Sequence, residues 1–250
     1  MNFSVLTYNL LYNRATKQLK KVLAACKPDL IFFQEMITGE EDLKLIENTG
    51  YKLADFSNSF IRRSGQIFGV ATFYNPKVFK AIRSRSFDLP AGILEALIFI
   101  LRKGEVPRTV LETEFVFKDS RKKLFAYNIH LSAAAMNTVR QKQIVNTFHE
   151  LKLNKKNPTI IAGDFNYPYK RRDFQELINQ HNLKEATKNL SFTSHFFKIR
   201  PFKLKLDYIL YKNLLSLETR RIDIKLSDHY PILSTFSLKQ KSNNHSTKAV

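Results

Sequence analysis

The sequence predicts an α/β fold, and three observations support this class. Eight apolar segments of strand length are spread along the chain, amphipathic helical segments lie between them, and no change in composition marks a domain boundary. With 250 residues and 44% hydrophobic content, the chain can bury a sizeable core. We therefore expect one domain over residues 1–238, with two packed sheets or one helix-covered sheet, and a disordered polar tail over residues 239–250.

The strand predictions rest on runs of apolar, β-branched and aromatic residues. Some of these runs alternate with polar residues and others are continuous, so they do not distinguish a sheet buried on one face from a sheet buried on both. The predicted strands cover residues 3–10, 29–35, 69–75, 109–117, 123–131, 159–165, 206–211 and 231–238.

Three segments show helical spacing of apolar residues. Residues 16–26 place Leu19, Val22, Leu23 and Cys26 on one stripe, and Pro28 follows the end of the helix. Residues 136–156 and 171–182 repeat this kind of pattern. The apolar run 93–101 is expected to be a core helix, with an exposed element that meets a membrane or a partner as the alternative.

The overall charge favours a polyanionic partner. The formal net charge is +19, which suits nucleic acid or an anionic membrane surface; a lysine-rich proteome is the alternative explanation. The single cysteine, Cys26, excludes a disulfide within the chain and a Cys-rich zinc site, and it favours the reducing cytoplasm. No signal peptide is expected, because the N-terminus lacks a basic start, a long apolar run and a small-residue cleavage site. No transmembrane helix is expected either, because the longest apolar run is far shorter than the ~20 residues that span a bilayer.

Carboxylates, amides and imidazoles stand at or just past the ends of several predicted strands. A rigid sheet can direct such side chains into one cleft, where they could hold a hard cation and a phosphate ester. Each residue taken alone has a structural alternative, such as a turn residue, a helix cap or a hydrogen-bonded histidine. The set comprises Asn9, Glu35, His130, Asp164, Asn166, Asp207, Asp228 and His229.

The order of these motifs resembles the endonuclease/exonuclease/phosphatase superfamily of metal-dependent phosphoesterases, which includes deoxyribonucleases, abasic-site endonucleases and tyrosyl-DNA phosphodiesterases. The matching blocks extend over most of the chain. They are "LTYNL" (6–10), "PDLIFFQE" (28–35), "GVATFYN" (69–75), "PRTVLETEF" (107–115), "NIHLS" (128–132) with "RQKQI" (140–144), "IIAGDFN" (160–166), "LDYIL" (206–210) and "SDHYPI" (227–232).

The resemblance implies a four-layered α/β sandwich, in which two mixed sheets pack face to face between helices. It places Asn9 and Glu35 at a divalent metal, Mg²⁺ with Mn²⁺ as the alternative, and His130 and Asn166 at the scissile phosphate.

The remaining implied roles concern the attacking water and the phosphate. Asp164 would orient or deprotonate the water. Asp228, also counted with the metal, would hold His229 against the phosphate, and Asp207 would support the site from behind. Arg108 lies in a block that often carries a polar group near the phosphate.

The loops around these motifs favour nucleic acid, and DNA in particular, as the substrate. "YPYKRR" follows the catalytic block directly and supplies Tyr167, Lys170, Arg171 and Arg172 as candidate substrate contacts, since cations can follow a phosphate backbone while aromatic rings stack on bases. A solvated basic loop is the alternative. We therefore expect a monomeric, metal-dependent nuclease or DNA-end-processing phosphodiesterase. A phosphatase or phosphodiesterase acting on lipid, inositol phosphate or another small phosphoester stays open, as does a non-catalytic binder.

Overall fold

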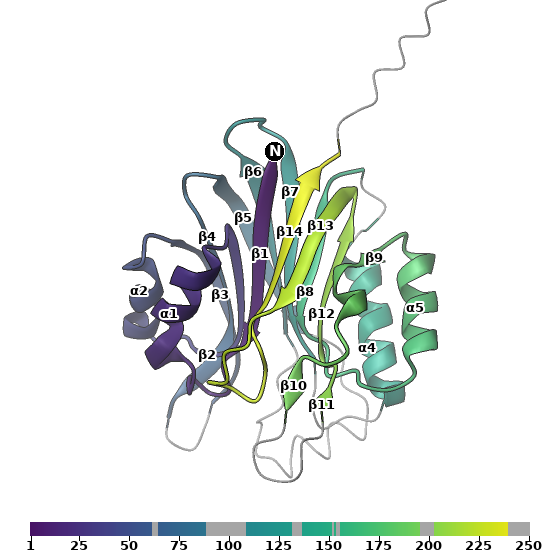
Figure 1. Cartoon of the computed structure of the whole chain (residues 1–250), viewed down its shortest axis with the longest axis horizontal. Helices are drawn as coiled ribbons and strands as arrows, with labels where there is room; N and C mark the ends of the chain where they lie inside the picture. The colour runs from purple at the N-terminus through teal and green to yellow at the C-terminus, as the bar shows by residue number, and fades with distance from the viewer. Residues whose placement is uncertain are drawn as a thin grey trace, which may run out of the picture.

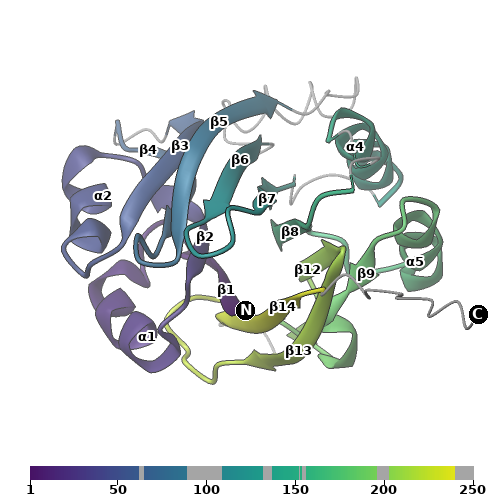
Figure 2. The same ribbon diagram turned by 90° about the horizontal axis from the view of Figure 1, so that it is seen from above.

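In the computed structural model, two β-sheets lie face to face at the centre of the molecule (Figures 1 and 2). The structure describes residues 1–61, 65–88, 109–131, 137–151, 153, 156–195 and 203–239. The predicted apolar segment 93–101, Arg108 and tail residues 240–250 lie outside these ranges.

Each sheet has six strands. The first has the order β13 (Leu214–Arg221), β14 (Ile232–Leu238), β1 (Asn2–Asn9), β2 (Leu30–Ile37), β4 (Ile67–Tyr74) and β3 (Lys52–Ile61). The second has the order β5 (Phe79–Asp88), β6 (Thr109–Phe117), β7 (Lys123–His130), β8 (Thr159–Asp164), β12 (Asp207–Lys212) and β9 (Lys184–Glu185). A small hairpin pairs β10 (Ser194–His195) with β11 (Lys203–Leu204).

Helices cover the outer face of each sheet. The first sheet carries a 3₁₀ turn (Thr16–Gln18), α1 (Leu19–Cys26) and α2 (Glu40–Glu47). The second carries α4 (Asn137–Glu150) and α5 (Arg171–Gln180), and a second 3₁₀ turn (Ala186–Asn189) follows β9. One apolar core lies between the sheets and one lies under each pair of helices, which is the layering of an α/β sandwich. The two-sheet alternative of the sequence analysis is thus confirmed.

The strand directions bring distant segments to one edge of the sandwich. β1 and β2 are parallel, as are β7 and β8, while β14 runs antiparallel to β1 and β12 antiparallel to β8. The carboxyl ends of β1, β2, β7 and β8 therefore lie with the beginnings of β12 and β14, at the lower end of the molecule in Figure 1. This edge collects the polar residues that the sequence places at strand ends.

A buried amide pair connects the two sheets behind this edge. Gln34 Nε2 donates to Asn128 Oδ1 at 2.8 Å, and Asn128 Nδ2 donates to the carbonyls of Ala71 and Phe33 at 3.0 and 3.1 Å. All of these groups are removed from water, so each depends on its partner within the protein. The network fixes how the sheets sit against each other where the strand ends meet.

Gly163 allows β8 to lie close against β7. It pairs with Ile129 across the parallel ladder and has φ +149°. A Cβ atom at this position would lie 1.9 Å from the carbonyl oxygen of Ile129, which is backbone and has no rotamer that could relieve the clash. The glycine of the "GDFN" motif is therefore a packing requirement that holds Asp164 beside His130, its partner in the ladder.

None of the helices in the described part of the chain has both the length and the apolar character needed to cross a bilayer.

Candidate active site

Six of the predicted site residues meet at the edge where the strands end. Asn9 is the last residue of β1, His130 ends β7 and Asp164 ends β8, while Asp207 begins β12. Glu35 lies near the end of β2, and His229 lies just before β14. Because both sheets contribute, the site forms only when the sandwich is complete.

Asp164 is in contact with three of these side chains. Its Oδ2 accepts a hydrogen bond from Asn9 Nδ2 at 3.0 Å and lies 3.7 Å from Nε2 of His130 and 3.6 Å from Nε2 of His229. Asp164 is only 1% exposed, and burial raises the pKa of its carboxyl, while the neighbouring histidines act in the opposite direction. One carboxylate oxygen thus links residues from both sheets.

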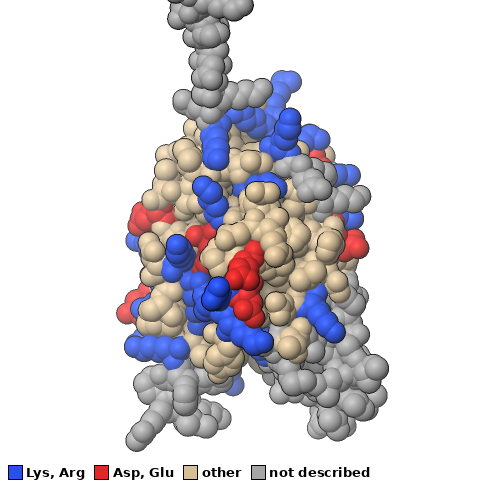
Figure 3. Space-filling view, turned by 90° about the vertical axis from the view of Figure 1, so that its right-hand side faces the viewer, with Lys and Arg blue, Asp and Glu red and all other residues tan. Residues whose placement is uncertain are grey.

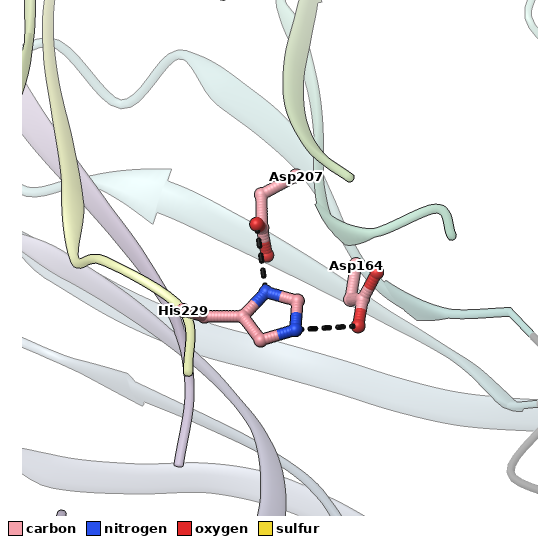
Figure 4. Close-up of side chains that lie close together, drawn as sticks. All are labelled: Asp164, Asp207 and His229. Carbon is pink, nitrogen blue, oxygen red and sulfur yellow. Dashed lines mark hydrogen bonds and ion pairs between the residues drawn. The ribbon is translucent and has the colours of Figure 1, made fainter. Parts of the chain in front are cut away.

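His229 is held by Asp207, not by Asp228 as the sequence analysis expected. Nδ1 of His229 lies 2.8 Å from Oδ2 of Asp207, and the imidazole stands between Asp207 and Asp164 (Figure 4). Asp228 instead accepts a hydrogen bond from the hydroxyl of Ser227 at 3.2 Å. The physical reason is a bend over residues 226–228, in which the Asp228 carboxylate and the backbone N–H of His229 both bond the Ser227 hydroxyl, so Asp228 acts on the ring through its charge and not through a hydrogen bond.

The neighbouring carboxylates favour the protonated form of His229. Burial by itself would lower the pKa of the imidazole, but Asp207 and Asp164 outweigh it and hold that pKa well above its usual value. A cationic imidazole at this position can donate a hydrogen bond from Nε2 to an anionic group.

A β-bulge directs Glu35 into the site. Between the pairs Phe33↔Ala71 and Met36↔Gly69, β2 contains one residue more than β4, and Glu35 adopts φ 52°, in the left-handed region. Strain of this kind costs about 1–3 kcal/mol and is concentrated at functional sites. The turn brings Oε1 of Glu35 to 3.2 Å from Asn9 Nδ2 and 3.7 Å from His130 Nε2.

Several polar atoms of the site are buried without a partner. Among the described residues, Oε2 of Glu35, both ring nitrogens of His130 and Oδ1 of Asp207 have no hydrogen bond. Burial raises the pKa of Glu35 to about 7 and lowers the pKa of His130 to about 4, so His130 is neutral near pH 7. Such orphaned atoms are costly unless a ligand satisfies them.

The donor set fits a hard divalent cation. Asp164 and Asp207 are buried and Glu35 is largely buried, so three carboxylates lie at one site, and the Asn9 side chain adds an amide. Mg²⁺ and Mn²⁺ prefer oxygen ligands of this kind, and a bound cation would offset the repulsion between the acids. Ligand atoms of Asp164, Asp207 and His229 also lie within 4.8 Å of one another, although His229 and Asp207 already use that proximity for their hydrogen bond.

Asn166 lies at the border of this cluster. Its backbone N–H donates to Oδ1 of Asp164 at 2.9 Å, its Nδ2 donates to the carbonyl of Leu131 at 3.0 Å, and its φ is 48°. The sharp turn places Asn166 beside the residue that follows His130. The contacts of its side chain support the loops on both sides of the site.

Two of the predicted substrate contacts have structural roles. The side chain of Tyr167 is fully buried against Phe174 of α5, because the alternation that directs Asp164 and Asn166 to the site turns Tyr167 towards the helices. Its expected role in stacking on substrate is wrong for this conformation. Arg171 binds Glu185 at 2.9 Å and lies over the ring of Tyr208, so it is not extended into solvent.

The other predicted cations lie on the surface. Lys170 is half-exposed, 4.0 Å from Asp173, and Arg172 is 90% exposed with Glu176 at 3.3 Å. Neither contacts the buried cluster in the interactions of the described residues.

The sequence analysis missed Arg140 as a site residue. α4 brings its guanidinium to the border of the site, where burial lowers its pKa and the charges of Asp164, Tyr169 and Tyr167 act in the opposite direction. Its position in "RQKQI", directly after "NIHLS", was the available signal. Tyr8 was missed too, and burial together with Asp228 raises the pKa of its hydroxyl.

The match to a family model, together with the fold, places this chain among the phosphoesterases. The model of the Endonuclease/Exonuclease/phosphatase family matches residues 6–229, so the chain belongs to this family. The resemblance found from the motifs is thereby confirmed. A search of curated proteins found no match.

Solved structures share the fold at low sequence identity. A family member from Bacteroides vulgatus has a TM-score of 0.76 at 18% identity and covers 96% of this chain and 100% of its own. The human Nocturnin catalytic domain with bound sulfate has a TM-score of 0.75 at 19% identity, and the match covers 95% of each chain. A mannosyl-6-phosphatase from Bacteroides thetaiotaomicron has a TM-score of 0.69 at 18% identity, and the match covers 94% of this chain and 100% of the phosphatase chain.

Proposed function

We propose that this protein is a Mg²⁺-dependent phosphodiesterase that hydrolyses nucleic acid, with Mn²⁺ as a second usable ion and DNA as the preferred substrate. The observation that carries the proposal is the convergence on one buried oxygen, Asp164 Oδ2, of Asn9, His130 and His229 from both sheets. A buried carboxylate beside a cationic and a neutral imidazole can move a proton and stabilise an anion, which phosphoester hydrolysis requires.

Each residue has a role that follows from its contacts. Asp164 orients the attacking water and accepts its proton, while His229, held by Asp207, donates a hydrogen bond to the phosphate. Neutral His130 contacts a phosphate oxygen through a ring nitrogen that has no partner among the described residues. Glu35 and Asn9 would hold the divalent cation, with Asp228 facing the same site; when bound, the cation offsets the negative charge that develops on the phosphate.

The surface charge supports nucleic acid as the substrate. A net charge of +19 attracts polyanions, and Arg140 stands at the border of the site together with the exposed Tyr169. The single cysteine is consistent with an enzyme of the reducing cytoplasm, and we infer that the enzyme acts as a monomer.

The test is cleavage of a labelled panel of duplex DNA, single-stranded DNA, RNA and a 5′-tyrosyl oligonucleotide in Mg²⁺. Wild type is compared with Asp164→Asn and with Asp119→Asn, a matched exchange at an exposed residue beyond β6. We expect Asp164→Asn to lose at least about 100-fold in rate, which is the low end for a general base, and Asp119→Asn to retain wild-type activity. EDTA should abolish cleavage. Equal activity in all three proteins would refute the proposal.

A small phosphomonoester is the second candidate substrate. The mannosyl-6-phosphatase from B. thetaiotaomicron has the same fold, so this scaffold also supports hydrolysis of a sugar phosphate in that protein. Sugar phosphates, an inositol phosphate and sphingomyelin liposomes therefore belong in the same panel. Turnover of one of these by wild type, with nucleic acids left intact, would favour the second candidate.

A further inference from the structure

A basic pocket opens beside the candidate active site. It is a cavity of about 330 Å³ between the beginning of α5, the second 3₁₀ turn and β11. Pro168 and Ser191 line it together with four cationic side chains, which are Arg171, Lys188, Lys203 and Lys205. We refer to this cavity as the Lys203 pocket. Figure 3, which looks onto the side of the molecule that carries α5, shows a cluster of Lys and Arg side chains beside acidic ones on its lower part, and further Lys and Arg side chains above.

One carboxylate offsets only part of this charge. Glu185 lies 2.9 Å from Nη2 of Arg171 and 2.7 Å from Nζ of Lys205, so a single acid is shared by two cations. Lys188 and Lys203 are exposed and form no ion pair in the interactions of the described residues. The pocket therefore has a positive charge that an anion from solution can reach.

Two cations of the pocket, Lys203 and Lys205, are held in place. Lys205 is 8% exposed and also donates to the carbonyl of Thr187 at 2.5 Å. The ammonium of Lys203 stands 4.6 Å from the ring centre of Phe192, a cation–π contact that limits its rotamers. A ligand that binds here loses little affinity to the ordering of side chains.

Two chain segments connect the pocket to the site. Pro168 follows Asn166 by two residues, and Lys205 precedes Asp207 by two, so the backbone between pocket and site is at most about 7 Å long on each side. Phe192, which contacts Lys203, lies 5.8 Å from the ring of Tyr230, the residue after His229. The distance between the pocket and the site is thus similar to the distance between neighbouring phosphates of one substrate strand.

We propose that the Lys203 pocket binds a backbone phosphate of the substrate strand that neighbours the scissile phosphate. The inference rests on the proposed function and assigns to it a second phosphate site. The cations supply charge for the phosphate oxygens, and the Ser191 hydroxyl at the pocket wall can donate a hydrogen bond. A substrate that carries one phosphate would gain nothing from this pocket, whereas a polynucleotide would bind at both places.

A second basic cavity provides a matched control. Lys122, Lys123, Lys156 and Lys239 line about 400 Å³ at the opposite end of the second sheet. Lys123 begins β7, whose last residue is His130, so roughly 23 Å of strand separates this cavity from the site. Removing lysines there changes the net charge equally and leaves the Lys203 pocket intact.

The experiment measures binding of a fluorescein-labelled single-stranded oligonucleotide in EDTA, so that binding is read without cleavage. Wild type is compared with Lys188→Gln/Lys203→Gln and with the control Lys122→Gln/Lys156→Gln, and melting curves establish that all three are folded. We expect the pocket variant to bind about 10-fold more weakly at low salt, and the magnitude of its slope of log K against log salt to fall by about 0.7, as the loss of one phosphate contact predicts. The control should bind like wild type.

A second readout separates failure of the pocket from failure of the proposed function. Hydrolysis of bis(p-nitrophenyl) phosphate, a diester with one phosphate, should proceed at equal rates in all three proteins in Mg²⁺. The pocket assignment would be overturned if both variants bound the oligonucleotide equally more weakly than wild type, or if neither variant bound it more weakly. Absence of hydrolysis by wild type would refute the proposed function, while the binding data would still decide the pocket.

Discussion

Replacement of Asp207 by asparagine tests which carboxylate holds His229. The asparagine retains the shape of the side chain and an oxygen that can accept from Nδ1, but it removes the negative charge. A hydrogen bond that involves a charged group contributes about 1.5–3 kcal/mol, and the observed contact of 2.8 Å is typical of such a bond. Because 1.36 kcal/mol corresponds to a factor of ten in rate, we expect kcat/KM to fall about 10- to 150-fold.

The assay is a double-mutant cycle on the cleavage reaction. Asp207→Asn, His229→Ala and the double variant are compared, and Asp228→Asn is taken through the same cycle. If Asp207 acts through His229, adding Asp207→Asn to His229→Ala costs little further activity. Asp228 hydrogen-bonds Ser227, so the rate reductions caused by Asp228→Asn and by His229→Ala should multiply in the double variant. Multiplying effects for Asp207, or wild-type activity in Asp207→Asn, would refute the reasoning.

Three further predictions concern stability. Gly163→Ala should prevent folding or cost at least about 4 kcal/mol in urea unfolding, since its Cβ would lie 1.9 Å from a backbone oxygen; a cost below 1 kcal/mol would contradict the packing. Asn128→Ala should lower the free energy of unfolding by about 2–4 kcal/mol, because it removes the buried hydrogen bonds of Asn128 with Gln34 and with the carbonyls of Ala71 and Phe33, and a melting temperature equal to wild type would exclude this. Glu185→Gln should cost about 3 kcal/mol at pH 7, since it leaves Lys205 buried without its counterion. Burial alone would raise the pKa of Glu185, but the cations Lys205 and Arg171 lower it. The difference in unfolding free energy between wild type and Glu185→Gln should therefore be constant above pH 4.5 and become smaller as the pH falls below it. A difference that grows in acid would contradict the lowered pKa.

The strands that the sequence failed to predict lie at the edges of the fold. The eight predicted strands all form, whereas β3, β5, β9 and β13, each at the edge of a six-stranded sheet, and the short hairpin strands β10 and β11 were missed. An edge strand packs fewer side chains into the core, so its apolar pattern is weak; β13, for example, exposes Leu215 and Leu217. α2 was missed for a related reason, since its eight residues bury only Leu43 and Ile46.

The sequence by itself determined the eight inner strands of the two sheets and which polar residues stand at their ends. That information is local: apolar runs specify buried strands, and a polar residue at the end of such a run is visible in the chain. The order of the motifs also determined the family, which the match over residues 6–229 confirms.

Only the tertiary structure decided which of these residues touch one another. His229 is paired with Asp207, 22 residues away, and not with its neighbour Asp228, because the direction of each side chain depends on how its segment packs. For the same reason Tyr167 lies in the core, and the charge of Asp164 acts on Arg140 of α4. Contacts of this kind are set by the packing of two sheets and their helices, which adjacency in the sequence does not encode.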